Sequence, residues 1–235
     1  MDACRVDYER VLARARSADP DEIRRVLAED LPYEWLDAYK GMTPHQTNVL
    51  RVQDSGFEYL FDFPTELVEH GVLSAEVAVE DRLVVVHGES RPHSGKRNDS
   101  AMRRWPVGPV ESMATFHRGG YDRGHFIAHS LGGDLSINLF TQPSAVNRGW
   151  SEEGKLFRSM ERYCQRHRGT YCFCRPIYVG RSAHPATIEF GLLKPDGKLW
   201  VNTFSNTGRP GEMPEIERLL SEKLRASPPP DRGRY

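Results

Sequence analysis

Tyr121-Asp122-Arg123-Gly124-His125 lies near the middle of the chain, and we expect this stretch to be extended. A second strand is predicted over residues 135–142, which are rich in apolar and β-branched residues. Apolar residues at helical spacing then predict a helix over residues 145–166. The order strand, strand, helix therefore organises the centre of the fold.

The side chains of the first stretch are suited to chemistry at a phosphodiester. His125 is our candidate general base, because an imidazole can take a proton from water near neutral pH. Arg123 projects to the same side of an extended segment and can hold phosphate oxygens in bidentate fashion. Gly124 leaves room for a close approach of backbone or substrate. Asp122 falls on the other face by alternation, where it can pair with a neighbouring cation or fix the turn.

A candidate metal site follows further along the chain. Magnesium keeps several of its waters and often takes only one or two protein oxygens, so the amide oxygen of Asn147 is an adequate sole ligand. A carboxylate on the following helix could then hold the waters of the ion through hydrogen bonds. Glu152, Glu153 and Glu161 are the carboxylates available there.

These residues together resemble the DNA/RNA non-specific endonuclease family, whose active site is a ββα-metal motif, also called a His-Me finger. The resemblance rests on Asp122-Arg123-Gly124-His125, on an Asn-x-x-x-Gln segment that begins at Asn138, and on Asn147, in this order. It extends over residues 110–165 and is similar in particular to bacterial members, among them secreted nucleases and toxin domains.

The resemblance implies a role for each matching residue. His125 would activate the attacking water, Asn147 would bind the divalent ion and Arg123 would contact phosphate. Asn138 would support the strand-to-helix geometry. The full set of candidate site residues is Asp122, Arg123 and His125 as the catalytic group, Asn147 as the metal ligand, and Asn138 and Arg148 as nucleic-acid contacts.

The family also has a glutamate eight residues after its metal-binding asparagine, and here position 155 is a lysine. The segment Phe157-Arg-Ser-Met-Glu161 matches the aromatic-x-x-apolar-Glu pattern of the family if about six residues are inserted after Gly149. We therefore choose Glu161 as the metal-site carboxylate, with Glu153 as the alternative.

The rest of the chain predicts an α+β fold with a largely antiparallel sheet. Short helices are expected from Asp7 and, with Asp19 as N-cap, from Pro20 through Leu27. Further expected elements are strands over 46–52, 56–63, 76–79, 83–87 and 171–179, a hairpin of 186–193 with 198–204, an exposed basic loop over 91–109 and a helix over 212–225. The expected organisation is a helical segment over 1–42, a nuclease domain over 43–225 and a disordered tail over 226–235.

Charge is distributed unevenly along the 235 residues. Residues 1–90 carry 9 Lys and Arg against 19 Asp and Glu, a net charge of −10, and residues 91–235 carry 23 against 14, a net charge of +9. Basic surface favours a polyphosphate partner. The acidic half motivates the hypothesis that it shields the basic half or binds an inhibitor or immunity protein, since a free nuclease is lethal to its producer.

The chain has no apolar run long enough to cross a bilayer and no signal-peptide pattern at its start. We expect a soluble protein made in the cytoplasm, with no membrane partner; export without a cleavable signal stays open.

The cysteines and tryptophans each allow two interpretations. Cys164, Cys172 and Cys174, with His167 between them, invite a zinc site, but Cys-x-Cys in an apolar strand favours two thiols packed in the core. Trp105 and Trp150 could stack on bases, but a Trp beside a helix start more often packs in the core.

The function that the sequence predicts is magnesium-dependent hydrolysis of DNA or RNA phosphodiester bonds with little sequence preference, with Mn²⁺ as a substitute ion. A toxin, a defence effector and a scavenging enzyme all fit it. The alternative is a nucleic-acid or protein-binding module of the same fold with an incomplete metal site, which Lys155 favours.

Overall fold

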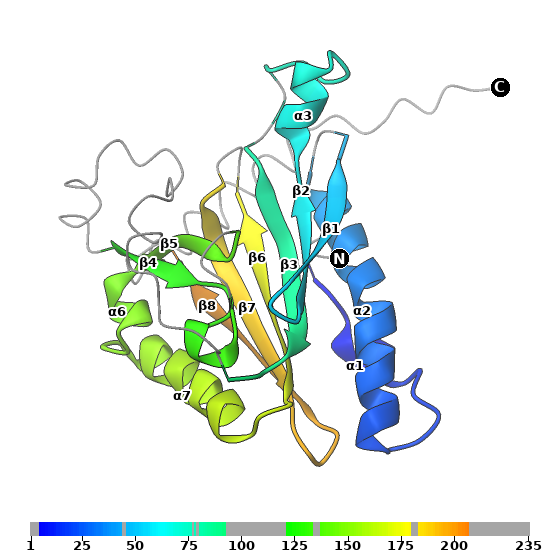
Figure 1. Ribbon diagram of the computed structural model, residues 1–235, viewed down its shortest axis with the longest axis vertical. Helices are drawn as coiled ribbons and strands as arrows, with labels where there is room; N and C mark the ends of the chain where they lie inside the picture. The colour runs from blue at the N-terminus through cyan, green and yellow to red at the C-terminus, as the bar shows by residue number, and fades with distance from the viewer. Residues whose placement is uncertain are drawn as a thin grey trace.

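The computed structural model has a layered α+β architecture (Figure 1). One layer holds the N-terminal helices, the middle layer is a six-stranded antiparallel sheet, and the opposite layer holds a two-stranded hairpin with its helices. A mixed α and β fold with a mostly antiparallel sheet was the prediction, and it is confirmed. The structure describes residues 5–43, 46–76, 78, 80–92, 121–133, 137–179 and 183–206.

Every neighbouring pair in the large sheet is antiparallel. The first three strands form a meander, and the last two form the predicted hairpin, which turns at Gly197 with a φ of 75°. Pairing of Val86 with Cys174 joins these two parts in the middle of the sheet. In spatial order the strands are β1 (Val49–Asp54), β2 (Phe57–Asp62), β3 (Arg82–Glu89), β6 (Tyr171–Tyr178), β7 (Pro185–Leu193) and β8 (Leu199–Ser205).

The N-terminal helices cover one face of this sheet. α1 (Tyr8–Leu12) is short, and α2 (Pro20–Met42) begins at the predicted N-cap Asp19, whose side chain accepts a backbone hydrogen bond. α2 does not end at Leu27 as predicted. It continues to Met42 because Leu31, Trp35 and further apolar residues extend its buried face against the sheet.

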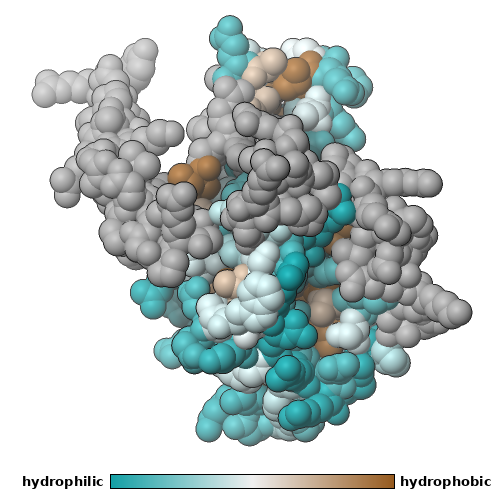
Figure 2. All heavy atoms as spheres, turned by 90° about the vertical axis from the view of Figure 1, so that its left-hand side faces the viewer, coloured by the Kyte–Doolittle hydropathy of each residue, from teal (hydrophilic) through white to brown (hydrophobic). Residues whose placement is uncertain are grey.

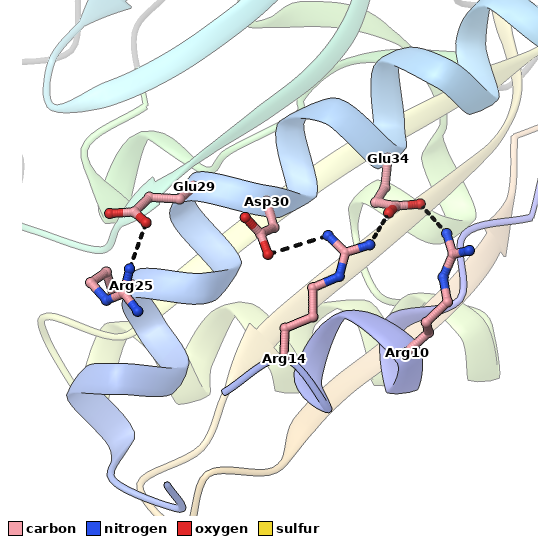
Figure 3. Close-up of polar contacts among 6 residues, drawn as sticks. All are labelled: Arg10, Arg14, Arg25, Glu29, Asp30 and Glu34. Atoms are coloured by element: carbon pink, nitrogen blue, oxygen red, sulfur yellow. Dashed lines mark hydrogen bonds and ion pairs between the residues drawn. The ribbon is translucent and has the colours of Figure 1, made fainter. Parts of the chain in front are cut away.

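The acidic residues of this layer are paired mainly within the layer itself (Figure 3). The ion pairs drawn in Figure 3, which join the α1 region to α2 or lie along α2, are Arg10 with Glu34, Arg14 with Glu34, Arg14 with Asp30, and Arg25 with Glu29. The layer lies on the face of the sheet opposite to the hairpin that holds His125 (Figure 1). The large sheet therefore separates these two helices from the hairpin, and the hypothesis that the acidic half shields the basic half stays a prediction.

The segment between β2 and β3 differs from the prediction in two places. It contains a helix that was not predicted, α3 (Pro64–Glu69), with Pro64 at its first position. A strand was expected over 76–79, but Glu76 lies in a turn and Ala78 has no regular secondary structure. β-branched composition leads to a strand only where a neighbouring strand is in place to pair with it.

The predicted helix over 145–166 is divided in two. α6 (Ser144–Asn147) ends before Gly149, whose φ of 71° is in the left-handed region that favours glycine. α7 (Glu152–Arg166) then starts at Ser151, which accepts a hydrogen bond from the backbone of Gly154. α7 packs Phe157, Met160 and Cys164 against the second face of the large sheet.

The cysteines lie in this second core as apolar side chains. Cys164, Cys172 and Cys174 are free thiols with no exposed surface, and burial is a cause of the raised pKa of both Cys172 and Cys174. His167, by contrast, is exposed, and the centroid of its ring lies 4.4 Å from the ring centroid of Tyr163. Core packing, the second of the two interpretations, is the arrangement observed.

None of the helices within the described ranges has the length and apolar character needed to span a lipid bilayer. The predicted helix over 212–225, the tail over 226–235, Trp105 and nearly all of the predicted basic loop lie outside the described residues.

Candidate active site

A short hairpin carries most of the predicted site residues. β4 (Tyr121–His125) pairs antiparallel with β5 (Leu139–Pro143), and α6 follows β5 directly. Alternation along β4 places Arg123 and His125 on one face of the hairpin and Asp122 on the other. The predicted order of two strands and a helix is thus observed, although both strands are short.

The connection between the two strands is held by Asn138. Its Oδ1 accepts a hydrogen bond from the backbone N–H of Ile127 at 2.9 Å, and its Nδ2 donates to the carbonyl of Ile127 at 2.7 Å. Asn138 has no exposed surface. Because its amide both accepts and donates a backbone hydrogen bond, Asn138 supports the geometry of the hairpin, as the resemblance implies. Its buried side chain does not reach a nucleic acid. The assignment of Asn138 as a nucleic-acid contact is therefore corrected.

Asp122 joins the hairpin to the end of α6. Its two carboxylate oxygens accept hydrogen bonds from Nε and Nη2 of Arg148, each at 2.7 Å. One of the same oxygens accepts a hydrogen bond from Nδ2 of Asn147 at 3.2 Å. These hydrogen bonds, above all those from Arg148, lower the pKa of Asp122. Of the two alternatives for Asp122, the structure shows the first, because this residue pairs with the neighbouring cation Arg148.

Asn147 is fixed from a second side by α7. Nη1 of Arg158 donates to the carbonyl oxygen of Asn147 at 3.0 Å. Arg158 reaches this carbonyl by passing Gly149, where an added Cβ would lie 2.6 Å from its Cδ. Because Asp122 engages the amide nitrogen of Asn147, the amide oxygen is turned away from that carboxylate. The arrangement orients a hard oxygen ligand of the kind that Mg²⁺ prefers.

The two candidate carboxylates of α7 have different surroundings. Glu161 lies one turn beyond Arg158 and interacts with it electrostatically. Glu153 instead accepts a hydrogen bond of 3.5 Å from the backbone of Ser205 at the end of β8. Lys155, at the position where the family has glutamate, is exposed and pairs with Glu152. Since Arg158 binds the carbonyl of Asn147, these contacts favour Glu161 over Glu153.

Gln142 is a residue of this hairpin that sequence reasoning did not single out for a role. It is 1% exposed, and neither Oε1 nor Nε2 has a hydrogen-bond partner within the described part of the chain. An added Cβ at Gly124 would lie 2.4 Å from its Oε1, so a glycine is required across the hairpin. The only signal in the sequence was its spacing from Asn138 in the Asn-x-x-x-Gln segment.

Arg123, His125 and His129 are all partly buried. Burial lowers the pKa of the Arg123 guanidinium, which still carries its charge at neutral pH. His129 starts the 3-10 turn η1 (His129–Leu131) that follows β4. Convergence of His125 and Asn147 on one hydrated ion is an expectation from the sequence and belongs to the proposal below.

Within the ranges that the structure describes, His, Cys, Asp and Glu do not gather in groups of three or more that could hold a metal ion. The predicted magnesium site is of another type, with one amide oxygen and the ion's own waters. In comparisons with known proteins, no family model matches the chain and no curated protein matches it.

The carboxyl group of Glu161 predicts a pH-dependent stability. Burial raises its pKa to about 7, although Arg158 and Arg162 act to lower it. The folded protein therefore binds a proton that the unfolded chain releases at lower pH, and stability falls as the pH rises from about 4.5 to about 7. We expect the Glu161→Gln variant to have the same unfolding midpoint in urea as the wild type near pH 4.5. At pH 8 its midpoint should lie at a higher urea concentration than that of the wild type.

Urea unfolding in EDTA at the two pH values measures this difference. Glu152→Gln is the matched control, because Glu152 is exposed and pairs with the exposed Lys155. A Glu161→Gln variant that is less stable than the wild type at pH 8 would contradict the prediction.

Proposed function

We propose that this chain is a divalent-metal-dependent nuclease that hydrolyses DNA or RNA phosphodiester bonds through a ββα-metal site on the β4–β5–α6 unit. The observation that carries the proposal is the hydrogen bonding of Asp122 to Asn147 and Arg148. It joins the Asp-Arg-Gly-His stretch to the asparagine that the resemblance makes the metal ligand, over a separation of 25 residues.

In the proposed reaction the protein binds, orients and moves one proton. Arg123 holds two oxygens of the scissile phosphate. His125 takes a proton from a water molecule, whose oxygen attacks the phosphorus as the bond to the 3′ oxygen breaks. Asn147, oriented by Asp122, would hold the ion, and Glu161 would orient its waters. A bound hydrated Mg²⁺ would supply charge stabilisation and an acidic water as the proton source for the leaving 3′ oxygen.

Such a site would tolerate many sequences, because its contacts fall on the phosphate backbone rather than on base edges. The products would carry 5′-phosphates, as the resemblance implies. The face that holds α6 and α7 is mainly hydrophilic in its lower half (Figure 2).

The second candidate is a binding module of the same fold without catalysis. Lys155, at the position where the family has glutamate, favours it. The two functions differ in one result, which is whether the backbone of a bound nucleic acid is cut.

The test is cleavage of supercoiled plasmid, circular single-stranded DNA and RNA by the purified full chain with Mg²⁺, Mn²⁺ or EDTA. We expect cleavage with either ion, none in EDTA, and products that ligase can rejoin. Asn147→Ala should lower the rate at least about a hundredfold, because several kcal/mol of charge stabilisation depend on the ion. Glu152→Gln, on the exposed side of α7, should cleave like the wild type.

Binding without cleavage in every metal condition would favour the binding module. Equal cleavage by the wild type and Asn147→Ala would contradict the proposed site.

A further inference from the structure

Trp150 has an unusual environment for a large aromatic residue. It lies between α6 and α7 and is 65% exposed, so the expectation that it packs in the core is wrong. Its backbone is nevertheless fixed, because its N–H donates to the carbonyl of Ala145 at 2.8 Å. The exposed ring is therefore attached to an ordered turn.

One face of the ring is in contact with Arg148. The guanidinium of Arg148 lies over the ring of Trp150, with 4.9 Å between its Cζ and the ring centroid. The same guanidinium is held by the two hydrogen bonds that it donates to Asp122. The carboxylate of Asp122 compensates the charge of Arg148, so this part of the surface is not strongly cationic. The groups that it presents are the planar guanidinium and the aromatic ring. Arg148 therefore serves better as a support for Trp150 than as a phosphate ligand.

The position of this ring relative to Asn147 is informative. Trp150 is three positions after Asn147, so their Cα atoms are at most about 10 Å apart. Each nucleotide of a stacked strand advances about 3.4 Å along the helix axis, so a strand whose phosphate lies at Asn147 has its neighbouring bases within reach of Trp150. The other large apolar side chains exposed in the described ranges, which belong to other elements or to the middle of α7, are Tyr33, Leu50, Val72 and Leu156.

We propose that Trp150, supported by Arg148, is a stacking platform for the base of an unpaired nucleotide next to the scissile phosphate. The ligand is thus single-stranded or locally unpaired nucleic acid, and the inference rests on the proposed function. Stacking tolerates every base, since each has a π face, which agrees with cleavage of low sequence preference. A paired base in a duplex is already stacked and has to leave its neighbours before it can occupy the platform.

The experiment measures binding apart from cleavage. Fluorescence anisotropy in EDTA gives the Kd of the full chain carrying His125→Ala for three labelled ligands of equal length: a thymidine 12-mer, an abasic 12-mer and a duplex. Trp150→Ala in this background should weaken binding of the thymidine 12-mer about tenfold or more. It should leave the Kd of the abasic 12-mer unchanged, because the two strands carry the same phosphates.

Two further variants control for other causes. Trp150→Phe keeps an aromatic face and should recover most of the lost affinity. Tyr33→Ala removes a ring that is 63% exposed and lies under the guanidinium of Arg51, but in α2 on the opposite side of the sheet. Tyr33→Ala should bind all three ligands as its parent does.

Other results would overturn the platform. Unchanged binding of the thymidine 12-mer by Trp150→Ala would do so, and so would an equal loss for the abasic strand, which would indicate a backbone contact. A parent that binds none of the ligands overturns both the platform and the proposed function. Trp150-dependent binding together with a wild type that never cleaves in Mg²⁺ supports the platform and overturns the nuclease.

Discussion

Replacement of His125 by alanine should lower the rate of Mg²⁺-dependent cleavage about a thousandfold. General-base catalysis by a positioned imidazole contributes about 10²- to 10⁴-fold, and His125 is the only histidine within β4. Binding should change little, because the proposal assigns the phosphate contact to Arg123. The measurement is single-turnover cleavage of a labelled single strand at saturating protein, with the Kd determined in EDTA.

Free imidazole in the assay should restore part of the rate to His125→Ala, which a merely structural role would not predict. His70→Ala is the matched control, since His70 is exposed at the end of α3. If His125→Ala keeps more than about a tenth of the wild-type rate, His125 is not the general base.

Replacement of Asn138 by alanine should lower the free energy of unfolding by about 3 kcal/mol. The variant removes both hydrogen bonds to Ile127, at 2.9 and 2.7 Å, from a fully buried site. The N–H and C=O groups of Ile127 then lose their partners, and each unsatisfied buried group costs about 1–3 kcal/mol. Urea unfolding in EDTA measures the effect without any contribution from a bound ion.

Asn202→Ala is the control for this second prediction. Asn202 is partly buried in β8, and its amide contacts only the sulfur of Met160, at 3.5 Å. We expect a loss below about 1 kcal/mol for this variant. Equal losses for the two variants would mean that the hydrogen bonds of Asn138 contribute nothing particular to the hairpin.

The fold was predictable where short-range signals decide it. The cap at Asp19 and the hairpin of β7 with β8, which turns at Gly197, each depend on a few adjacent residues. The length of α2 was not predictable in this way, because the residues after Leu27 are held by the sheet that they cover. The helix break at Gly149 depends likewise on the space that Arg158 occupies.

The candidate site likewise has features that the sequence predicted and features that only packing decides. The sequence identified Asp122, Arg123, His125 and Asn147 from residue type and order alone. It left two partners open for Asp122, and it assigned to Asn138 a contact that its burial forbids. It expected Trp150 in the core, whereas the ring is exposed beside Arg148.

The sequence alone determined the α+β class, the strand and helix segments around Asp-Arg-Gly-His, and the residue types available for phosphodiester chemistry, because these depend on neighbours along the chain. Only the tertiary structure decided that Asp122 holds Asn147 and Arg148 together, that Asn138 supports Ile127, and that the acidic helices lie on the opposite face of the sheet. The hydrogen bonds concerned join residues 11 to 26 positions apart, and a distance of that kind is set by packing rather than by local propensity.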